Sequence, residues 1–279
     1  MVRQTKNLPI AVPGARGAYS QLAARRFFGE NRPALSCGTA AEAVRALALG
    51  KASHAVLPVE NSITGAFAGV AEAFFEGDIA VVGEILLPIR HCVLGNPGSR
   101  LEELSVITGH PSSIAQCRDW IASWGFATRV SNDTGDAARE LAASGDPALG
   151  VLGSRELAHT YALEVLAEGV SDRADNRTRF LVLAERGSQA VEGSRHAVQV
   201  GPVTTPRVLK TLRIQLESLG ASRVRVPFLG SEDGTRFLIE FDQPDGRGSS
   251  AASRACGNLP HRYLGAWTPG RPFLNGSED

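Results

Sequence analysis

Short apolar runs alternate with amphipathic stretches over the first two thirds of the chain. The runs that predict strands are 8–12, 55–59, 79–87, 91–94, 105–108, 127–130, 148–152 and 180–184. Apolar residues at helical spacing predict helices at 20–28, 39–47, 65–75, 114–124, 136–143 and 156–166. Strands that alternate with helices in this way favour an α/β fold built on largely parallel sheet.

The pattern changes after a polar linker at 185–194. Strands are expected at 197–200, 222–229, 235–242 and 261–267, and helices at 206–219, capped by Thr205, and 249–256. A turn near Asp233 and Gly234 joins the middle two strands. The resulting order β-α-β-β-α-β predicts a small second domain. We therefore expect domains at 1–187 and 195–269, followed by a loose tail at 270–279.

Composition narrows the function classes without choosing among them. The chain has 279 residues, with Lys+Arg 29 and Asp+Glu 29, and this balance argues against a nucleic-acid-binding protein. No apolar run is long enough to span a membrane, and no signal-peptide core follows the start, so a cytoplasmic protein is expected. The four cysteines form no C-x-x-C pair, which predicts reduced thiols and no metal site. Only three of the basic residues are lysines, which indicates either codon bias or repeated carboxylate recognition by arginine.

Polar residues gather just after the predicted strands, where ligands bind in α/β sheets. The segments concerned are Gly14 to Ser20, Glu60-Asn61-Ser62, His110 to Cys117, Thr134, and Asp175 to Phe180. The first lacks the third glycine of a dinucleotide fingerprint and any Lys-Ser/Thr ending, so an anion at a helix N-terminus is the better interpretation. Taken singly, Ser20 and Thr134 could be helix caps and Asn61 a turn former. Together the segments predict one cleft of hydroxyl, amide and guanidinium groups, suited to a small polar anion.

These segments, in this order and at these separations, resemble the prephenate dehydratase family. The resemblance also rests on 83–85 with Pro88 and Ile89, on His91-Cys92, and above all on Asn176 with Thr178-Arg179-Phe180. It implies conversion of prephenate to phenylpyruvate in phenylalanine biosynthesis, with loss of water and carbon dioxide and without a cofactor. It also implies a two-lobed, periplasmic-binding-protein-like catalytic domain. Lobe 1 is then expected at about 1–87 and 172–187, and lobe 2 at about 88–171.

The reaction asks for little chemistry, because losing the ring carboxylate and the hydroxyl gives an aromatic ring. The protein must hold two carboxylates and help hydroxide to leave, for which a hydrogen-bonding hydroxyl serves as a weak general acid. By resemblance this role falls to Thr178, with Asn61 and Glu60 beside it. The residues expected to contact substrate are Ser20, Ser62, Gln116, Thr134, Asn176, Arg179 and Phe180. His91 and His110 are interpreted as structural, and a second Thr-Arg-Phe at 235–237 as coincidence.

The small domain resembles an ACT domain, the phenylalanine-sensing module of this family, and implies a homodimer or homotetramer. Its effector motifs depart from the family pattern. Arg207-Val208-Leu209 stands where the family has Gly-Ala-Leu, and Val226-Pro227 begins the segment where it has Glu-Ser-Arg-Pro. An arginine in place of a glycine should block a tight ligand site, so weak or absent phenylalanine inhibition is expected.

Three alternatives stay open at this point. Relatives that decarboxylate prephenate without aromatising it lack the Glu-Asn-Ser and Thr-Arg-Phe motifs, both of which are present here. Arogenate is a closely related substrate. A non-catalytic ligand-sensing protein is the alternative of another class.

Overall fold

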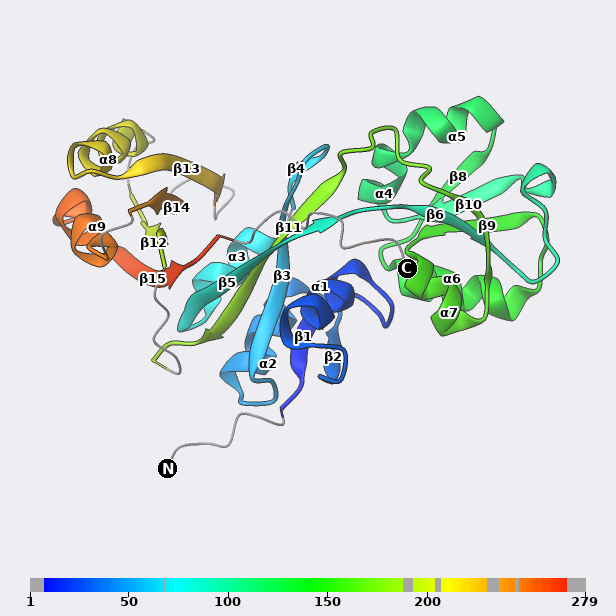
Figure 1. The fold of residues 1–279 in the computed structure, drawn as a ribbon, viewed down its shortest axis with the longest axis horizontal. Helices are drawn as coiled ribbons and strands as arrows, with labels where there is room; N and C mark the ends of the chain where they lie inside the picture. The colour runs from blue at the N-terminus through cyan, green and yellow to red at the C-terminus, as the bar shows by residue number, and fades with distance from the viewer. Residues whose placement is uncertain are drawn as a thin grey trace.

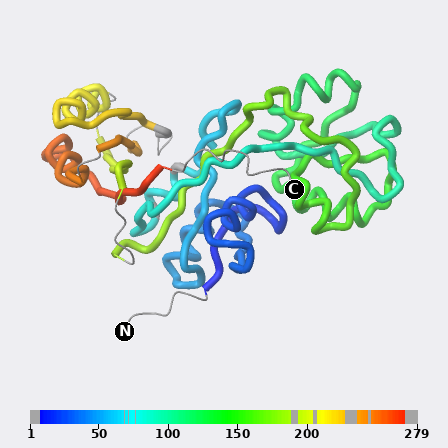
Figure 2. The backbone as a smooth tube through the Cα atoms, viewed as in Figure 1, coloured from blue at the N-terminus to red at the C-terminus, as the bar shows by residue number. Residues whose placement is uncertain are grey.

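The computed structural model describes residues 8–67, 69–187, 193–203, 207–229, 236–243 and 246–269. Three bodies lie in a row, each with its own sheet (Figures 1 and 2). Lobe 1 is in the middle, lobe 2 on one side of it, and the small domain on the other. The long strands β5 (Ile79–Pro88) and β11 (Arg177–Glu185) belong to lobe 1 and lead to and from lobe 2. The α/β fold class with two lobes and a small βαββαβ domain is confirmed. The expectation of largely parallel sheet is wrong. The strand Arg177–Glu185 pairs antiparallel with both of its neighbours, and so does the strand Cys92–Gly95.

Lobe 1 is built on a mixed sheet of strand order β2-β1-β3-β11-β5, in which β4 pairs with β3. The strands are β1 (Ile10–Pro13), β2 (Ala34–Cys37), β3 (His54–Asn61), β4 (Gly65–Ala66), β5 (Ile79–Pro88) and β11 (Arg177–Glu185). The helices are α1 (Tyr19–Phe28), α2 (Ala40–Ala48) and α3 (Val70–Glu76). One face of the sheet packs against α1, and the opposite face packs against α2 and α3.

Lobe 2 has the strand order β10-β6-β9-β7-β8. Its strands are β6 (Cys92–Gly95), β7 (Val106–Gly109), β8 (Ala127–Val130), β9 (Leu149–Gly153) and β10 (Glu164–Glu168). Its helices are α4 (Pro111–Gln116), α5 (Arg118–Trp124), α6 (Thr134–Ser144) and α7 (Arg155–Tyr161), with the 3-10 helix η2 at Leu101–Glu103. The chain therefore changes lobe after β5 and returns before β11.

The small domain is an antiparallel sheet of order β13-β14-β12-β15. It comprises β12 (Arg195–Val200), α8 (Arg207–Ser218), β13 (Ser222–Leu229), β14 (Phe237–Asp242), α9 (Gly248–Cys256) and β15 (His261–Trp267). Both helices cover one face. The other face contributes Leu238, Leu264 and Trp267 to the core of lobe 1. The order of these strands and helices along the chain is the one that the sequence pattern predicts.

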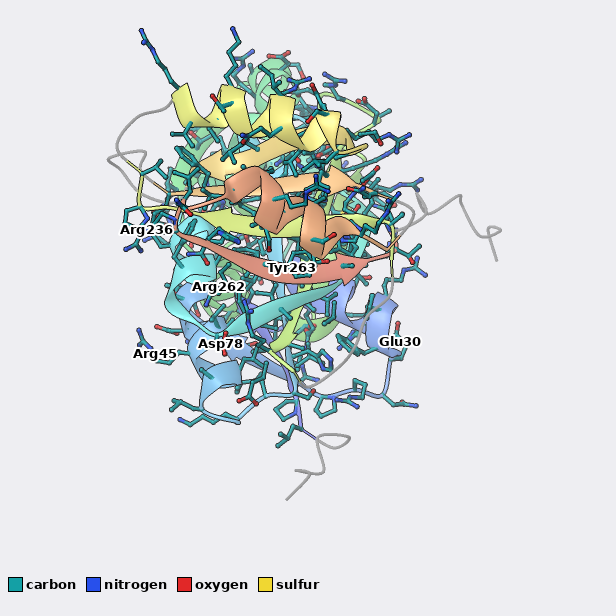
Figure 3. All side chains as sticks on the ribbon, turned by 90° about the vertical axis from the view of Figure 1, so that its left-hand side faces the viewer. Glu30, Arg45, Asp78, Arg236, Arg262 and Tyr263 are labelled. Carbon is teal, nitrogen blue, oxygen red and sulfur yellow. The ribbon has the colours of Figure 1, made fainter. Side chains whose placement is uncertain are left out.

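Strand β15 joins the small domain to lobe 1 at close range. Figure 3 shows Arg262 of β15 beside Asp78, and its guanidinium donates to the carbonyl oxygens of Phe74 (2.9 Å) and Gly77 (2.6 Å) at the C-terminal end of α3. A Cβ at Gly265 would lie 2.8 Å from the Val81 carbonyl oxygen, and its φ of +123° disfavours any side chain. The two bodies therefore share a tightly fitted boundary.

Three predicted helices differ from the structure. The helix predicted at 65–75 is the short strand β4 followed by α3, because Gly69 adopts a left-handed conformation just before the helix. The helix predicted at 114–124 starts earlier and breaks at Cys117, where the Asp172 carboxylate accepts from the backbone N–H groups that open α5.

The helix predicted at 156–166 ends at Tyr161, because Ala162 turns left-handed, and its last residues belong to β10. The linker at 188–192, the 233–234 turn, Thr205 and the tail from 270 lie outside the described residues. The predicted domain boundaries stay predictions.

Candidate active site

A cavity of about 910 Å³ lies between the two lobes. Thr178 and Phe180 of β11 line it from lobe 1, together with Ser20 at the start of α1. Gln116 and Thr134 line it from lobe 2. The structure thus brings together five of the residues that the sequence predicts for the site. The volume is typical of a pocket for a small organic molecule.

Asn61 reaches this site because of an irregularity in β3. Along β3, Leu57 and Val59 face the core that α2 and α3 cover, and Val56 faces the α1 side. Strict alternation would turn Asn61 toward the former side. The pairing with β11 shifts between Arg179 and Phe180, so that Asn61 pairs with Thr178 while Pro58 pairs with Phe180. This bulge places Asn61 on the cavity side, next to Thr178.

A chain of buried amides fixes the orientation of the Thr178 hydroxyl. The backbone N–H groups of Ile63 and Thr64 donate to Asn61 Oδ1, at 2.9 and 3.1 Å. The Nδ2 group of Asn61 must then face the other way, where it donates to Asn176 Oδ1 (2.8 Å) and Thr178 Oγ1 (3.0 Å). Because Thr178 Oγ1 accepts this bond, its own proton is free to be donated into the cavity.

The same chain of hydrogen bonds continues into lobe 2. Asn176 Nδ2 donates to Gln116 Oε1 at 2.8 Å, and Gln116 Nε2 donates to Ser112 Oγ at 2.9 Å. Gln116 Oε1 is also 2.8 Å from His91 Nε2, so the proton of the neutral imidazole sits on Nε2. Burial lowers the pKa of His91 to about 4, which keeps the ring neutral near pH 7. His91 therefore orients Gln116, and the two lobes share one network.

Several helices have their N-termini at the cavity. Helices α1, α2, α3, α4 and α6 begin at residues that line it, and so does Ser154, the N-cap of α7. Among the described lining residues there is no lysine or arginine. Helix dipoles favour an anion at such ends, and at α6 the Asp133 carboxylate already occupies this position. The guanidinium expected in the cleft is absent from its described walls, and the described lining residues include the acidic Glu72 and Asp133.

Two predicted site residues point away from the cavity. Arg179 follows Thr178 in a strand, so its side chain emerges on the opposite face, where it binds Glu84 and Glu240. Glu60 faces the small domain, and its carboxylate lies 3.9 Å from Arg225. The expected contacts of Arg179 and Glu60 with substrate are corrected accordingly.

The other predicted residues take supporting positions. Ser62 is exposed and accepts a hydrogen bond from the backbone of Arg177 (3.0 Å), which holds the start of β11. Neither Ser20 nor Thr134 is a helix cap: the cap of α6 is Asp133, whose Oδ1 accepts from the backbone N–H groups of Gly135 and Asp136. The other oxygen of Asp133 accepts from the backbone of Ala15, and this contact joins the lobes at 2.9 Å.

Sequence reasoning missed Asp133 and Ser154 among the lining residues. Asp133 immediately precedes a predicted helix, a position typical of an N-cap, and that signal could have found it. Ser154 Oγ donates to the Gly17 carbonyl oxygen at 2.8 Å and so also links the lobes.

The residues expected to be a degenerate effector site lie at separate elements of the small domain. Arg207, Val208 and Leu209 begin α8, and Val226 and Pro227 belong to β13. In the described part of the chain no group of three or more His, Cys, Asp or Glu residues could hold a metal ion. None of the described helices is both long and apolar enough to cross a membrane.

The model of the family "Prephenate dehydratase" matches residues 10–188. The chain belongs to the prephenate dehydratase family. It is 35% identical over 184 residues to arogenate dehydratase 2 of Petunia hybrida, covering 66% of this chain and 46% of that protein. It is 30% identical over 236 residues to a bifunctional chorismate mutase/prephenate dehydratase of Stutzerimonas stutzeri, covering 84% of this chain and 64% of that one. The chain thus spans about half the length of the plant relatives.

Solved structures of this family share the fold. Prephenate dehydratase from Arthrobacter aurescens, in complex with L-Phe, is 23% identical with a TM-score of 0.79, covering 97% of this chain and 92% of that chain. A structure described as GqqA, a novel type of quorum quenching acylases, is 29% identical with a TM-score of 0.80, covering 95% and 99%. The first likeness supports the three-body architecture and nothing about ligands.

Proposed function

We propose that this protein is a prephenate dehydratase that converts prephenate to phenylpyruvate. The observation that carries the proposal is the Thr178 hydroxyl, which is held by Asn61 and free to donate its proton into a cavity between two lobes. Membership of the family supports it. The reaction consumes one proton and the prephenate dianion, and releases carbon dioxide, water and the phenylpyruvate anion.

In this proposal the electrons of the ring carboxylate bond move into the ring as carbon dioxide leaves. The carbon–oxygen bond at the opposite ring position breaks at the same time. Thr178 donates a hydrogen bond to the departing oxygen, which leaves as water with the one proton that the overall reaction takes from solvent. Donors aimed at developing negative charge act strongly in a site that excludes water. Thr178 is 4% exposed and its partner Asn61 is 2% exposed, so bulk water does not compete for that bond.

The helix N-termini around the cavity would hold the two carboxylates. Ser20, Ser113 and Thr134 lie in the first turns of α1, α4 and α6 and add hydroxyl donors beside the backbone N–H groups. Phe180 supplies an apolar wall for the ring. Because no guanidinium lines the described cavity, we expect binding to depend on the total charge of the substrate.

Purified protein incubated with prephenate tests the proposal. Phenylpyruvate, read by its absorbance at alkaline pH, is the expected product. Substrate loss with a non-aromatic product would favour the decarboxylase alternative, and binding without turnover would favour a sensing protein. Arogenate run in parallel decides between the two dehydratase substrates, because plant relatives are named for arogenate.

Hydrolysis of an acyl group, suggested by the acylase relative, has less support. An acylase needs a nucleophilic hydroxyl bonded to a general base or otherwise activated. In the described cavity His110 Nδ1 accepts from the Ser112 backbone N–H, and His91 Nε2 faces Gln116. Neither imidazole is bonded to a serine or threonine hydroxyl among these contacts. If the purified protein released a carboxylic acid from an N-acyl amide, the acylase function would be favoured over the dehydratase function.

We further propose that the small domain is an ACT-like module with weak or absent phenylalanine inhibition, in an oligomer of cytoplasmic location. Arg207, which stands where the family has glycine, supports the loss of a tight effector site. An unchanged rate at millimolar phenylalanine is expected, and strong inhibition would refute the loss.

A further inference from the structure

A cluster of charged residues lies on the face of β3 and β11 that is turned away from the cavity. Arg179 forms a two-point ion pair with Glu240 of the small domain, with Nη1–Oε1 3.1 Å and Nη2–Oε2 2.9 Å. The same guanidinium donates to Glu84 of β5 at 2.9 Å. Glu240 is 0% and Arg179 5% exposed, so these charges are removed from water. Burial without such partners would be strongly unfavourable.

The cluster also receives Arg225 and Trp267 from the small domain. Arg225 lies 2.7 Å from Glu240 and 3.9 Å from Glu60. Trp267 Nε1 donates to Glu84 at 3.1 Å. Burial alone would raise the pKa of Glu84, but Arg179, Trp267 and Arg195 together hold it below its ordinary value. Carboxylates of lobe 1 and of the small domain thus share the same cations.

These residues are direct chain neighbours of the residues in the site. Arg179 follows Thr178, and Glu60 precedes Asn61, and the two pairs face each other across the strands. The regular ladder is interrupted here by the bulge in β3. Since a bulge leaves a residue unpaired, side-chain anchoring has more influence on the local backbone position.

We propose that Glu240 and Arg179 are positioning residues for the Thr178 hydroxyl. Glu240 fixes Arg179, Arg179 fixes the backbone of β11 at the bulge, and this keeps Thr178 Oγ1 within reach of Asn61 Nδ2. The small domain is then a structural support of the reacting group, whatever effector it binds. The expected effect on turnover rests on the proposed dehydratase function. The expected effect on the backbone of β11 rests on the fold alone.

Glu240→Gln tests this role, because the amide keeps the size of the side chain and removes the charge that Arg179 binds. Asp242→Asn is the matched control. Asp242 lies two residues further on the same strand and binds Arg195 at 2.8 Å, and none of its described contacts involves Arg179. Both variants lose a carboxylate from the same sheet face. Glu240 is fully buried whereas Asp242 is partly exposed, and Arg195 also lies 3.3 Å from Glu84, so the free energy of unfolding of both variants is measured alongside.

The first measurement is hydrogen exchange of a peptide spanning 177–182, at conditions where both variants are folded by circular dichroism. Faster exchange in Glu240→Gln than in Asp242→Asn is the expected result. Equal exchange in the two variants overturns the inference, and this arm does not depend on turnover.

The second measurement is a double-mutant cycle on phenylpyruvate formation. In the wild-type background Glu240→Gln should lower kcat about tenfold with little change in KM, since displacement of an oriented group by about 1 Å costs up to about a hundredfold. In a Thr178→Ala background it should leave the residual rate unchanged. An equal loss in both backgrounds overturns the inference while leaving the dehydratase function in place. No turnover by the wild type would refute that function, and the exchange experiment would then decide on Glu240.

Discussion

Replacing Asn61 by aspartate reverses the hydrogen bond on which the account depends. The Nδ2 group of Asn61 faces three oxygen atoms: Asn176 Oδ1 at 2.8 Å, the Arg177 carbonyl oxygen at 3.1 Å and Thr178 Oγ1 at 3.0 Å. A carboxylate at this position has no proton to donate to them. The Thr178 hydroxyl is the one of the three that can rotate and donate, and it would then point away from the cavity.

The expected cost follows from the loss of one aimed donor. Removal of such a donor typically lowers kcat by roughly 10²–10³, or about 2.7–4 kcal/mol. Because the substrate carboxylates bind elsewhere in the cavity, KM should change much less. A carboxyl buried among oxygen atoms has a raised pKa, and its protonated form can again donate to Thr178. Activity of Asn61→Asp should therefore recover in part as the pH falls.

The assay is kcat for phenylpyruvate formation by wild type and Asn61→Asp between pH 5.5 and 8.5. Ser62→Ala is the control, because this neighbouring hydroxyl bonds to backbone at Asp175 and Arg177 and not to Thr178. Its kcat should stay within a few-fold of wild type. A kcat of Asn61→Asp close to wild type at pH 8 would refute the proposed orientation of Thr178.

Three further outcomes are expected. The pKa of His91 is about 4 in the folded state and near 6.5 in the unfolded state, so the unfolded state binds more protons between these pH values. The free energy of unfolding should therefore fall as the pH drops through this window, by an amount on the order of 3 kcal/mol, and urea denaturation at a series of pH values should show a flatter dependence for His91→Gln. Gly265→Ala should lower the free energy of unfolding by about 1–3 kcal/mol, because it places a Cβ against Val81 at a φ of +123°; an unchanged melting temperature would contradict the tight boundary. Ser20→Ala should raise KM with little change in kcat, as expected of a group that binds substrate and transition state alike; an equal fall of kcat with unchanged KM would contradict this role.

The sequence was sufficient to predict the architecture and most of the site. Periodicity predicted most of the strands and helices and the βαββαβ order of the small domain, but not the strands β2, β4 and β10. The motifs around Asn61, Gln116, Asn176 and Thr178 identified residues that the structure joins in one hydrogen-bonded network. Asn61, Asn176 and Thr178 lie at or beside strand ends, and Gln116 ends α4; all four belong to the motifs by which the chain resembles the family.

The sheet face on which the side chains of Glu60 and Arg179 lie was harder to predict. Alternation already separates Arg179 from Thr178, and this signal was available in the sequence. For Glu60 it was misleading, because the bulge in β3 exchanges the faces of Glu60 and Asn61. The partner of Arg179 is a carboxylate 61 residues away in another domain, and no local pattern reveals such a pair. The helix break at Cys117 likewise depends on the carboxylate of Asp172, which is distant in the sequence.

Comparison of Thr178→Val with Thr178→Ser tests whether turnover needs the hydroxyl of residue 178. Valine keeps the shape of the threonine side chain without its hydroxyl, and serine keeps the hydroxyl. With both variants folded, phenylpyruvate should form from prephenate with Thr178→Ser and almost vanish with Thr178→Val. Formation by Thr178→Val at a rate near that of the wild type would contradict the assignment of Thr178 as the hydrogen-bond donor to the departing oxygen.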